Sequence, residues 1–262
     1  MHTMGYIAAL FIGMSLALIG GGGSILTVPV LVYLFGVSPV LATSYSLFVV
    51  GFTSLIGSFD SWRKGLLDFE TAFLFGLSSI LTVFITRKYI IPLIPENIFI
   101  GSFHIHFSIL TMLLFAVLML LASIAMIKSK TAPGYDMHHD KNFFIMVLYG
   151  IGIGLLTGFL GVGGGFILIP ALVILVHLPM KKAVGTSLLI IALNSLAGFI
   201  GDAGHFQTNW LLLLSISAIA ITGVFAGGLL RNTVDGVKLK KVFGWFVLIM
   251  GVYIIIKEIW LQ

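Results

Sequence analysis

Uncharged apolar runs of about 20 residues recur along this 262-residue chain, for example at 107–127 and 210–230. A helix of that length crosses the ~30 Å hydrocarbon layer of a bilayer. The runs do not alternate apolar and polar residues, as the strands of a membrane barrel would. Hydrophobic residues make up 59% of the chain and charged residues only 9%, too few polar groups for a soluble domain. The sequence therefore predicts an all-α polytopic membrane protein.

Several other classes of protein are excluded. The chain has no cysteine, which rules out disulfides, thiolate metal sites and cysteine nucleophiles. It contains no HExxH, GxSxG or P-loop motif, so we predict no enzyme, no cofactor and no metal site. The net charge is +5, but basic residues in a membrane protein usually set its orientation in the bilayer. We therefore predict no nucleic-acid partner. Residues 1–13 lack the Lys or Arg of a signal peptide, so the first segment is predicted to stay in the mature chain.

Polar residues and glycines divide the chain into ten hydrophobic segments. These segments are 5–19, 24–36, 39–58, 69–86, 105–127, 143–160, 166–178, 183–201, 210–230 and 240–260. The second and the seventh have only about 13 residues, which as helix cover ~20 Å and do not span comfortably. Both follow a run of glycines, GGGG at 20–23 and GVGGG at 161–165.

The two halves of the chain repeat each other. An offset of 141 residues aligns Pro29 with Pro170 and the segment 53–57 with 194–198. The same offset aligns the glycines of the two runs, with Gly20, Gly22 and Gly23 against Gly161, Gly163 and Gly164. The stretch 42–44 matches 185–187 after a slip of two residues. We therefore predict a first membrane repeat at 1–127, a linker at 128–142 and a second membrane repeat at 143–262.

Five segments in each repeat predict that the second repeat crosses the membrane upside down. The positions of the basic residues test this, because cytoplasmic loops carry an excess of Lys and Arg. With a cytoplasmic linker, three basic residues fall outside: Arg87, Lys88 and Lys257. Eleven fall inside: Arg63, Lys64, Lys128, Lys130, Lys141, Lys181, Lys182, Arg231, Lys238, Lys240 and Lys241. We expect a multi-pass protein of the cell membrane with both termini extracytoplasmic.

The glycine runs are costly, since each glycine weakens a helix by about 1 kcal/mol relative to alanine. Backbone that leaves the helix within a bilayer must be satisfied by protein or by a water-filled cavity. The segment after such a break begins with free N–H groups and the positive end of a helix dipole, which favour an anion. We predict that the two breaks converge near the midplane as an anion site formed by Gly20, Gly21, Gly22, Gly23, Ser24, Gly161, Gly163, Gly164 and Gly165. The alternative is close packing or a tight turn, and packing is the reading we favour for Gly150, Gly154 and Gly158.

Polar side chains within the segments are further candidate ligands. Ser187 and Asn194 lie seven residues apart, on one face of a helix. The other candidates are Thr43, Ser44, Thr53 and Thr186. Serine and threonine hydroxyls in membrane helices also bond the carbonyl one turn back, which is the competing interpretation. No Lys or Arg lies centrally in a segment, so the site is expected to use backbone N–H groups and hydroxyls without a buried cation.

Ionisable residues at the segment ends are candidates for carrying a coupling proton. Asp60 and Asp202 end the third and eighth segments, and His205 follows Asp202 by three residues. The alternative is that both aspartates are solvated or cap the next element. The HxH pair His104 and His106 lacks a third ligand, so an extramembrane loop is predicted there and no metal site.

Two long motifs, GGGGSILTVPVLVYLFGVSPVLATS and GFLGVGGGFILIPALVILVHLPMKKAVGTS, carry a family resemblance. They resemble the sulfite exporter TauE/SafE family, also called the toluene sulfonate uptake permease family, over nearly the whole chain. The resemblance implies a permease for a small sulfur oxyanion or organosulfonate, such as sulfite, thiosulfate or sulfoacetate. The two motifs differ where Gly21 aligns with Val162 and Ser24 with Gly165.

Two mechanisms remain open from the sequence. The first is a secondary transporter that works by alternating access, and the second is an anion-selective channel built on the same glycine breaks. An intramembrane enzyme lacks a catalytic motif, and a sensor lacks a soluble domain. The expected partners are a small anionic substrate and the lipid bilayer, with a homodimer as an open arrangement.

Overall fold

The computed structural model describes residues 2–95, 97–100, 103–128, 143–176, 178–205, 207–230 and 236–260. Each of the ten predicted segments contains a helix. In the first half these are α1 His2–Ile19, the 3-10 helix η1 Gly21–Leu26, α2 Thr27–Phe35, α3 Pro39–Arg63, α4 Phe69–Ile85, the π-helix η2 Thr86–Ile90, α5 Ile91–Leu93 and α6 Phe107–Lys128. In the second half they are α7 Phe143–Leu160, α8 Gly165–Leu175, α9 Met180–Gly201, α10 Trp210–Leu230 and α11 Gly236–Trp260.

Five stretches of the described chain are long and apolar enough to cross a membrane. They are Pro39–Arg63, Phe69–Leu93, Phe107–Ala125, Met180–Gly201 and Trp210–Leu229. Shorter apolar helices lie at Thr3–Ile19, Gly23–Phe35 and Phe144–Leu160. The prediction of a helical membrane protein is confirmed.

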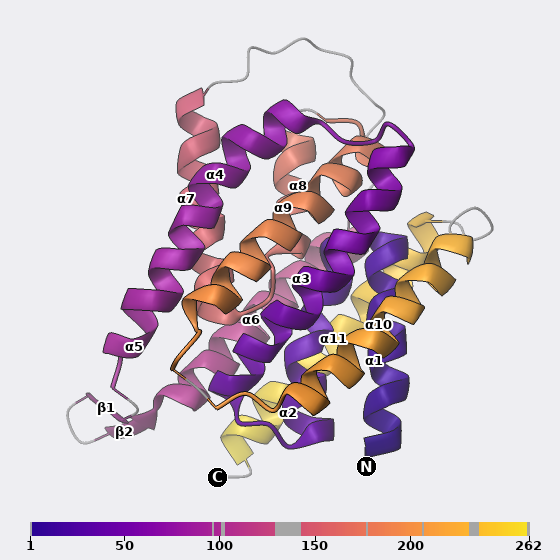
Figure 1. The fold of residues 1–262 in the computed structure, drawn as a ribbon. Coiled ribbons are helices and arrows are strands. Elements are labelled where there is room, and N and C mark those ends of the chain that lie inside the picture. The colour runs from indigo at the N-terminus through magenta and orange to yellow at the C-terminus, as the bar shows by residue number, and fades with distance from the viewer. Residues whose placement is uncertain are drawn as a thin grey trace.

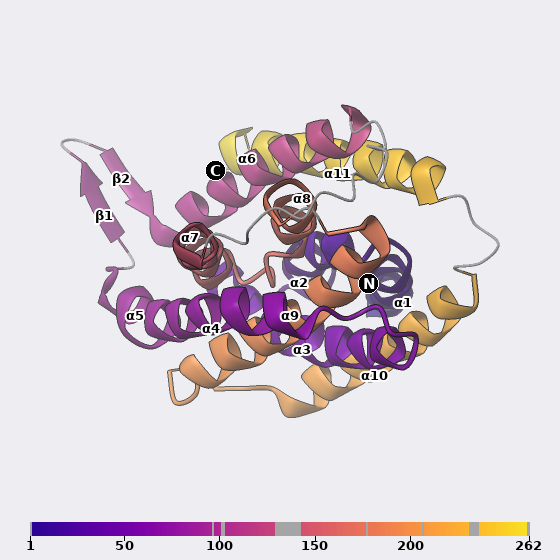
Figure 2. The same ribbon diagram turned by 90° about the horizontal axis from the view of Figure 1, so that it is seen from above.

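Helices α3 and α9 form the centre of the bundle. In each, 67% of the apolar stretch is buried inside the protein, compared with 39% for α4, α6 and α10. The two helices pack against each other, with α4 beside α9 and α10 beside α3 (Figures 1 and 2). The short helices α2 and α8 lie inside the bundle (Figure 2). The half-helices that follow the glycine runs are therefore enclosed by protein.

Small residues set the closest helix contacts. A Cβ on Gly13 of α1 would overlap the carbonyl of Ala220 in α10, and a Cβ on Gly154 of α7 would meet the backbone of Ser79 in α4. Gly150 lies as close to Ser78 of α4, and Gly158 to Thr86 of η2, so the predicted packing role of this glycine series is confirmed. These seams join α1 to α10 and α7 to α4.

One element differs from the all-helical prediction. A short antiparallel hairpin, β1 Asn97–Ile100 and β2 Phe103–His106, joins α5 to α6, with Asn97 opposite His106. It projects at the end of the bundle where α1 begins and α11 ends (Figure 1). The HxH pair thus lies on a strand outside the helices. The linker, apart from Lys128, lies outside the described residues.

Candidate functional site

The two glycine runs meet inside the protein. A Cβ on Gly21 would overlap the Cα of Gly165, and a Cβ on Gly165 would overlap the Cα of Gly21. Both positions also face the side chain of Ile191 in α9. Only glycine permits this approach, because any other residue would place a side chain into the opposite backbone.

The second run leaves the helix completely. Gly161, Gly163 and Gly164 have φ of 66°, 52° and 68°, a left-handed region that favours glycine. Gly164 is the N-cap of α8, and its carbonyl accepts from the N–H groups of Ile167 and Leu168. The N–H groups at the start of α8 have no carbonyl in their own helix. This run breaks the helix, as the sequence predicts, and its residues are buried.

The first run is more regular than predicted. Only Gly20 departs from helical backbone, with φ 78° and ψ −140°, and the 3-10 helix then continues into α2. The hydroxyl of Ser24 donates to the carbonyl of Gly21 within that turn. The two runs therefore differ in backbone conformation as well as in sequence. Ser24 in place of Gly165 gives the first run a side chain that closes its own turn.

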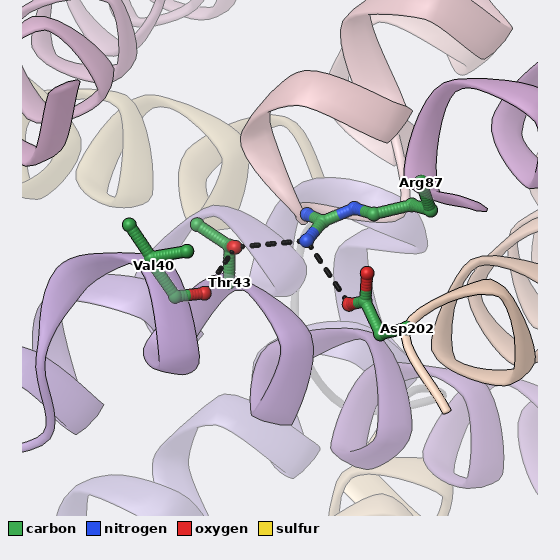
Figure 3. Close-up of polar contacts among 4 residues, drawn as sticks. All are labelled: Val40, Thr43, Arg87 and Asp202. Atoms are coloured by element: carbon green, nitrogen blue, oxygen red, sulfur yellow. Dashed lines mark hydrogen bonds and ion pairs between the residues drawn. The ribbon is translucent and has the colours of Figure 1, made fainter. Parts of the chain in front are cut away.

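A buried ion pair lies beside the second run (Figure 3). Nη1 of Arg87 is 3.1 Å from a carboxylate oxygen of Asp202 and donates to the hydroxyl of Thr43 at 3.0 Å. The exposed fraction of Arg87 is 1% and that of Asp202 is 5%. A Cβ on Gly161 would overlap Thr43, so this threonine joins the glycine run to the ion pair.

The position of Arg87 follows from the helix that carries it. Helix α4 does not end at the predicted boundary but continues through the π-turn η2 into α5. Small residues let its neighbours approach, since Gly158 of α7 contacts Thr86 and Gly201 of α9 contacts the Cβ of Arg87. The sequence held one signal for this: apolar residues resume at 89–94 after the two basic residues. Successive helix positions differ by about 100°, so Arg87 is buried while Lys88 is exposed.

The expectation of a site without a buried cation is wrong. Burial of a guanidinium and a carboxylate costs several kcal/mol per ion, so such pairs are rare without a specific role. Asp202 is likewise neither solvated nor a simple cap. Its carboxylate is buried and accepts a hydrogen bond from Nη1 of Arg87.

Most of the other candidate side chains bond within the protein. The hydroxyls of Thr43, Thr53 and Ser187 donate to carbonyls three or four residues back in their own helices. This is the bonding that the sequence analysis gave as the alternative to a role as anion ligands. Thr186 instead accepts from the N–H of Asp68 at the start of α4. Thr43 and Thr186, which the sequence comparison aligns, therefore have different surroundings. Nδ2 of Asn194 donates to Ser79 of α4 at 2.6 Å, while its Oδ1 is buried without a partner among the described residues.

Asp60 and His205 do not lie in a buried centre. Asp60 forms an exposed ion pair with Lys64 at 2.6 Å, and His205 is exposed in the turn after α9. Along α3, Asp60 is about 25 Å from Thr43, so it lies near the opposite end of the bundle from Asp202.

A pocket of about 650 Å³ opens near Asp60. Basic and acidic side chains at the end of α3 line it, with the ends of α1 and α10 and with Leu188 of α9. The charged lining residues are Asp60, Arg63 and Lys64. The two ends of the central helix pair thus differ, with a buried ion pair at one and a mainly apolar pocket that includes three charged residues at the other.

Comparison with known proteins identifies the family of the chain. The sequence model of the family "Sulfite exporter TauE/SafE" matches residues 6–254. The chain belongs to this family. It is 30% identical to a probable membrane transporter protein of Xylella fastidiosa (strain Temecula1), over 93% of this chain and 91% of that protein. No solved structure matches the chain.

Further relatives of this TauE/SafE protein have the same description. It is 30% identical to the probable membrane transporter protein YunE of Bacillus subtilis, over 84% of this chain and 83% of YunE. It is 23% identical to the probable membrane transporter protein YjnA of the same species, over 95% of this chain and 98% of YjnA. The protein is therefore a membrane transporter and not an enzyme.

Asn194 provides a test of the contact between α4 and α9 in this transporter. Replacement of Asn194 by leucine removes its bond to Ser79, and we expect the free energy of unfolding to fall by about 1 kcal/mol, a typical value for hydrogen bonds between membrane helices. Urea unfolding in detergent micelles would measure this. Ser187→Ala is the control, since that hydroxyl bonds only its own helix and should change stability by less than ~0.5 kcal/mol. Equal losses in the two variants would contradict the assignment.

Proposed function

We propose that this protein is a secondary transporter for a small sulfur-containing anion such as sulfite, thiosulfate or an organosulfonate. The observation that carries the proposal is the meeting of the two glycine runs next to a buried arginine, Arg87, whose two described hydrogen bonds both come from Nη1. The open start of α8 offers N–H groups and a positive helix end, and Arg87 adds a full positive charge. The family description supports sulfite and its relatives as substrates.

We further propose that residues 1–127 and 143–262 are inverted repeats, joined by the linker 128–142. Contacts support this by occurring in reciprocal pairs at the offset of 141 residues. Gly57 contacts Leu188 while Gly198 contacts Leu47, and Gly20 contacts Val184 while Gly161 contacts Thr43. The helix contacts follow the same rule. Helix α1 packs against α10, and its equivalent in the second repeat, α7, packs against α4, which is the equivalent of α10. A two-fold axis through the bundle would generate this pattern.

Alternating access fits the difference between the two ends better than a channel does. We propose that the Arg87–Asp202 pair closes the end near the start of α3, and that the pocket lined in part by Asp60, Arg63 and Lys64 forms an opening at the other end. An anion channel with the same glycine runs would need a continuous path through both ends. With the linker cytoplasmic and both termini extracytoplasmic, as the basic residues indicate, the open pocket faces the cytoplasm of the cell.

The anion site is proposed to lie at the second glycine run. Its members are Gly161, Gly163, Gly164, Gly165, Thr43, Ser44 and Asn194. The first run, with Gly20, Gly21, Gly22, Gly23 and Ser24, and the hydroxyls of Thr53, Thr186 and Ser187 are proposed to shape the opposing wall. For proton coupling we propose Asp202 with His205 nearby, since Asp60 already has an exposed partner in Lys64. A homodimer remains a prediction.

The proposal predicts saturable anion flux in proteoliposomes. Purified protein would be reconstituted, and uptake of labelled sulfite, thiosulfate and sulfoacetate would be measured beside sulfate and chloride. A transporter shows saturation and faster uptake when the lumen is preloaded with the same anion. A channel shows flux that follows the electrochemical gradient without such acceleration. No protein-dependent flux of any anion in the panel, compared with empty liposomes, would refute the proposed function.

A further inference from the structure

Arg87 uses only one of its three guanidinium nitrogens. Both of its contacts, to Thr43 and to Asp202, are made by Nη1. Its Nε and Nη2 are buried and have no hydrogen-bond partner among the described residues. Figure 3 shows these two nitrogens on the edge that faces away from the carboxylate of Asp202.

This edge has the shape of an oxyanion receptor. Nε–H and one N–H of Nη2 lie parallel in the guanidinium plane, and together they bind two oxygens attached to one central atom. Such a side-on pair of charge-assisted bonds is stronger and more selective than a single contact. A purely structural ion pair gains most when the carboxylate occupies this edge, yet Asp202 contacts Nη1 alone. The unpaired donors carry a desolvation cost that a bound oxyanion would offset.

Two further features place the edge in a functional setting. Arg87 lies in a π-turn, a distortion that is common at functional sites because it displaces side chains from the regular helix. The buried hydroxyls of Thr86 and Thr157 also lack partners among the described residues. Thr157 lies against Gly164 of the second glycine run, and Thr86 lies against Gly158, on the last turn of α7 before that run.

We propose that the Nε–Nη2 edge of Arg87 binds the transported oxyanion side-on, with ionised Asp202 as its counter-charge. This inference rests on the proposed transport function and names the group that selects its substrate. The ligand class is a small anion with two or three oxygens on one centre, as in sulfite or a sulfonate. Asp202 orients the guanidinium through Nη1 and repels the anion, which keeps binding weak enough for release.

The two residues should therefore have opposite effects on anion affinity. Lysine at position 87 keeps the charge but loses the parallel donors, so Arg87→Lys should bind sulfite about 10- to 100-fold more weakly. Asp202→Asn removes the repulsion and should bind sulfite about tenfold more tightly. Chloride has no second oxygen to engage the edge and should bind weakly in all variants. Lys88→Gln is the matched control, because Lys88 is the next cation on the same helix and is exposed.

Isothermal titration of the purified full-length protein in detergent, with sodium sulfite, sulfoacetate and chloride, would measure these affinities. The double variant Arg87→Gln/Asp202→Asn has no uncompensated buried charge and controls for loss of sulfite binding through misfolding. It should elute from size-exclusion chromatography as one species and bind no sulfite. Unchanged affinity in Arg87→Lys, or weaker sulfite binding in Asp202→Asn, would overturn the Arg87 site while leaving transport intact. No binding and no flux in the wild-type protein would instead refute the transport proposal and this inference with it.

Discussion

Replacement of Gly21 by valine is expected to abolish the folded transporter. The added Cβ would overlap the Cα of Gly165, and backbone cannot move aside as a flexible side chain can. Overpacking a core costs about 1–3 kcal/mol even where side chains yield, so we expect a loss of at least ~3 kcal/mol here. Thermal unfolding monitored by light scattering in detergent would report the stability, and proteoliposome uptake would report the activity. Gly165→Val should have the same effect, because the contact is mutual.

Gly152→Ala provides the matched control. Gly152 lies on the exposed face of α7, and a Cβ there would meet no described atom within 4 Å. Alanine should leave stability unchanged or raise it by up to ~1 kcal/mol, the difference in helix propensity. A Gly21→Val protein as stable and active as Gly152→Ala would show that the two glycine runs are not in contact.

The second large effect is expected at the buried ion pair. Loss of either partner leaves an uncompensated charge in the protein interior, so Arg87→Gln and Asp202→Asn should each lower the free energy of unfolding by about 3–5 kcal/mol. The double variant should lose much less than the sum of the two. Chemical unfolding of all four proteins gives the coupling energy, which for residues in direct contact is commonly about 0.5–3 kcal/mol.

The exposed pair Asp60–Lys64 serves as the comparison. Its N–O distance of 2.6 Å is shorter than that of the buried pair, but both side chains are about half exposed. Solvent screening limits such pairs to about 0–1 kcal/mol, so Asp60→Asn should change stability little. Effects of similar size at Asp60 and Asp202 would contradict the assignment of a buried, functional charge to Asp202.

The same contrast shows where sequence reasoning stops. Asp60 and Asp202 both end a long apolar helix, and the local sequence offers a basic partner only to Asp60, with Lys64 four residues on. Their environments differ because Asp202 meets Arg87, 115 residues away along the chain, whereas Asp60 meets Lys64 on the next turn of its own helix. Burial depends on which helices pack together, and a local pattern does not contain that information.

Arg87 is a second residue whose burial could not be predicted from the local sequence. Hydropathy ends the predicted segment just before Arg87, since charged residues usually mark the membrane surface. The helix nevertheless continues, because its backbone bonds are satisfied through the π-turn, and small residues on α7 and α9 leave space for the guanidinium. A charge can be buried in this way only where a partner from another helix compensates it.

The sequence by itself determined the helical membrane class, the places where the helices break and the family. Those features depend on run length and on glycine content, which act locally because a bilayer demands internally bonded helices. Only the tertiary structure decided that Gly21 touches Gly165 and that Arg87 is buried with one edge unpaired. It also showed that the first glycine run coils into a regular turn while the second stays open. These features arise from contacts between distant helices, whose close approach is set by the packing of the whole bundle.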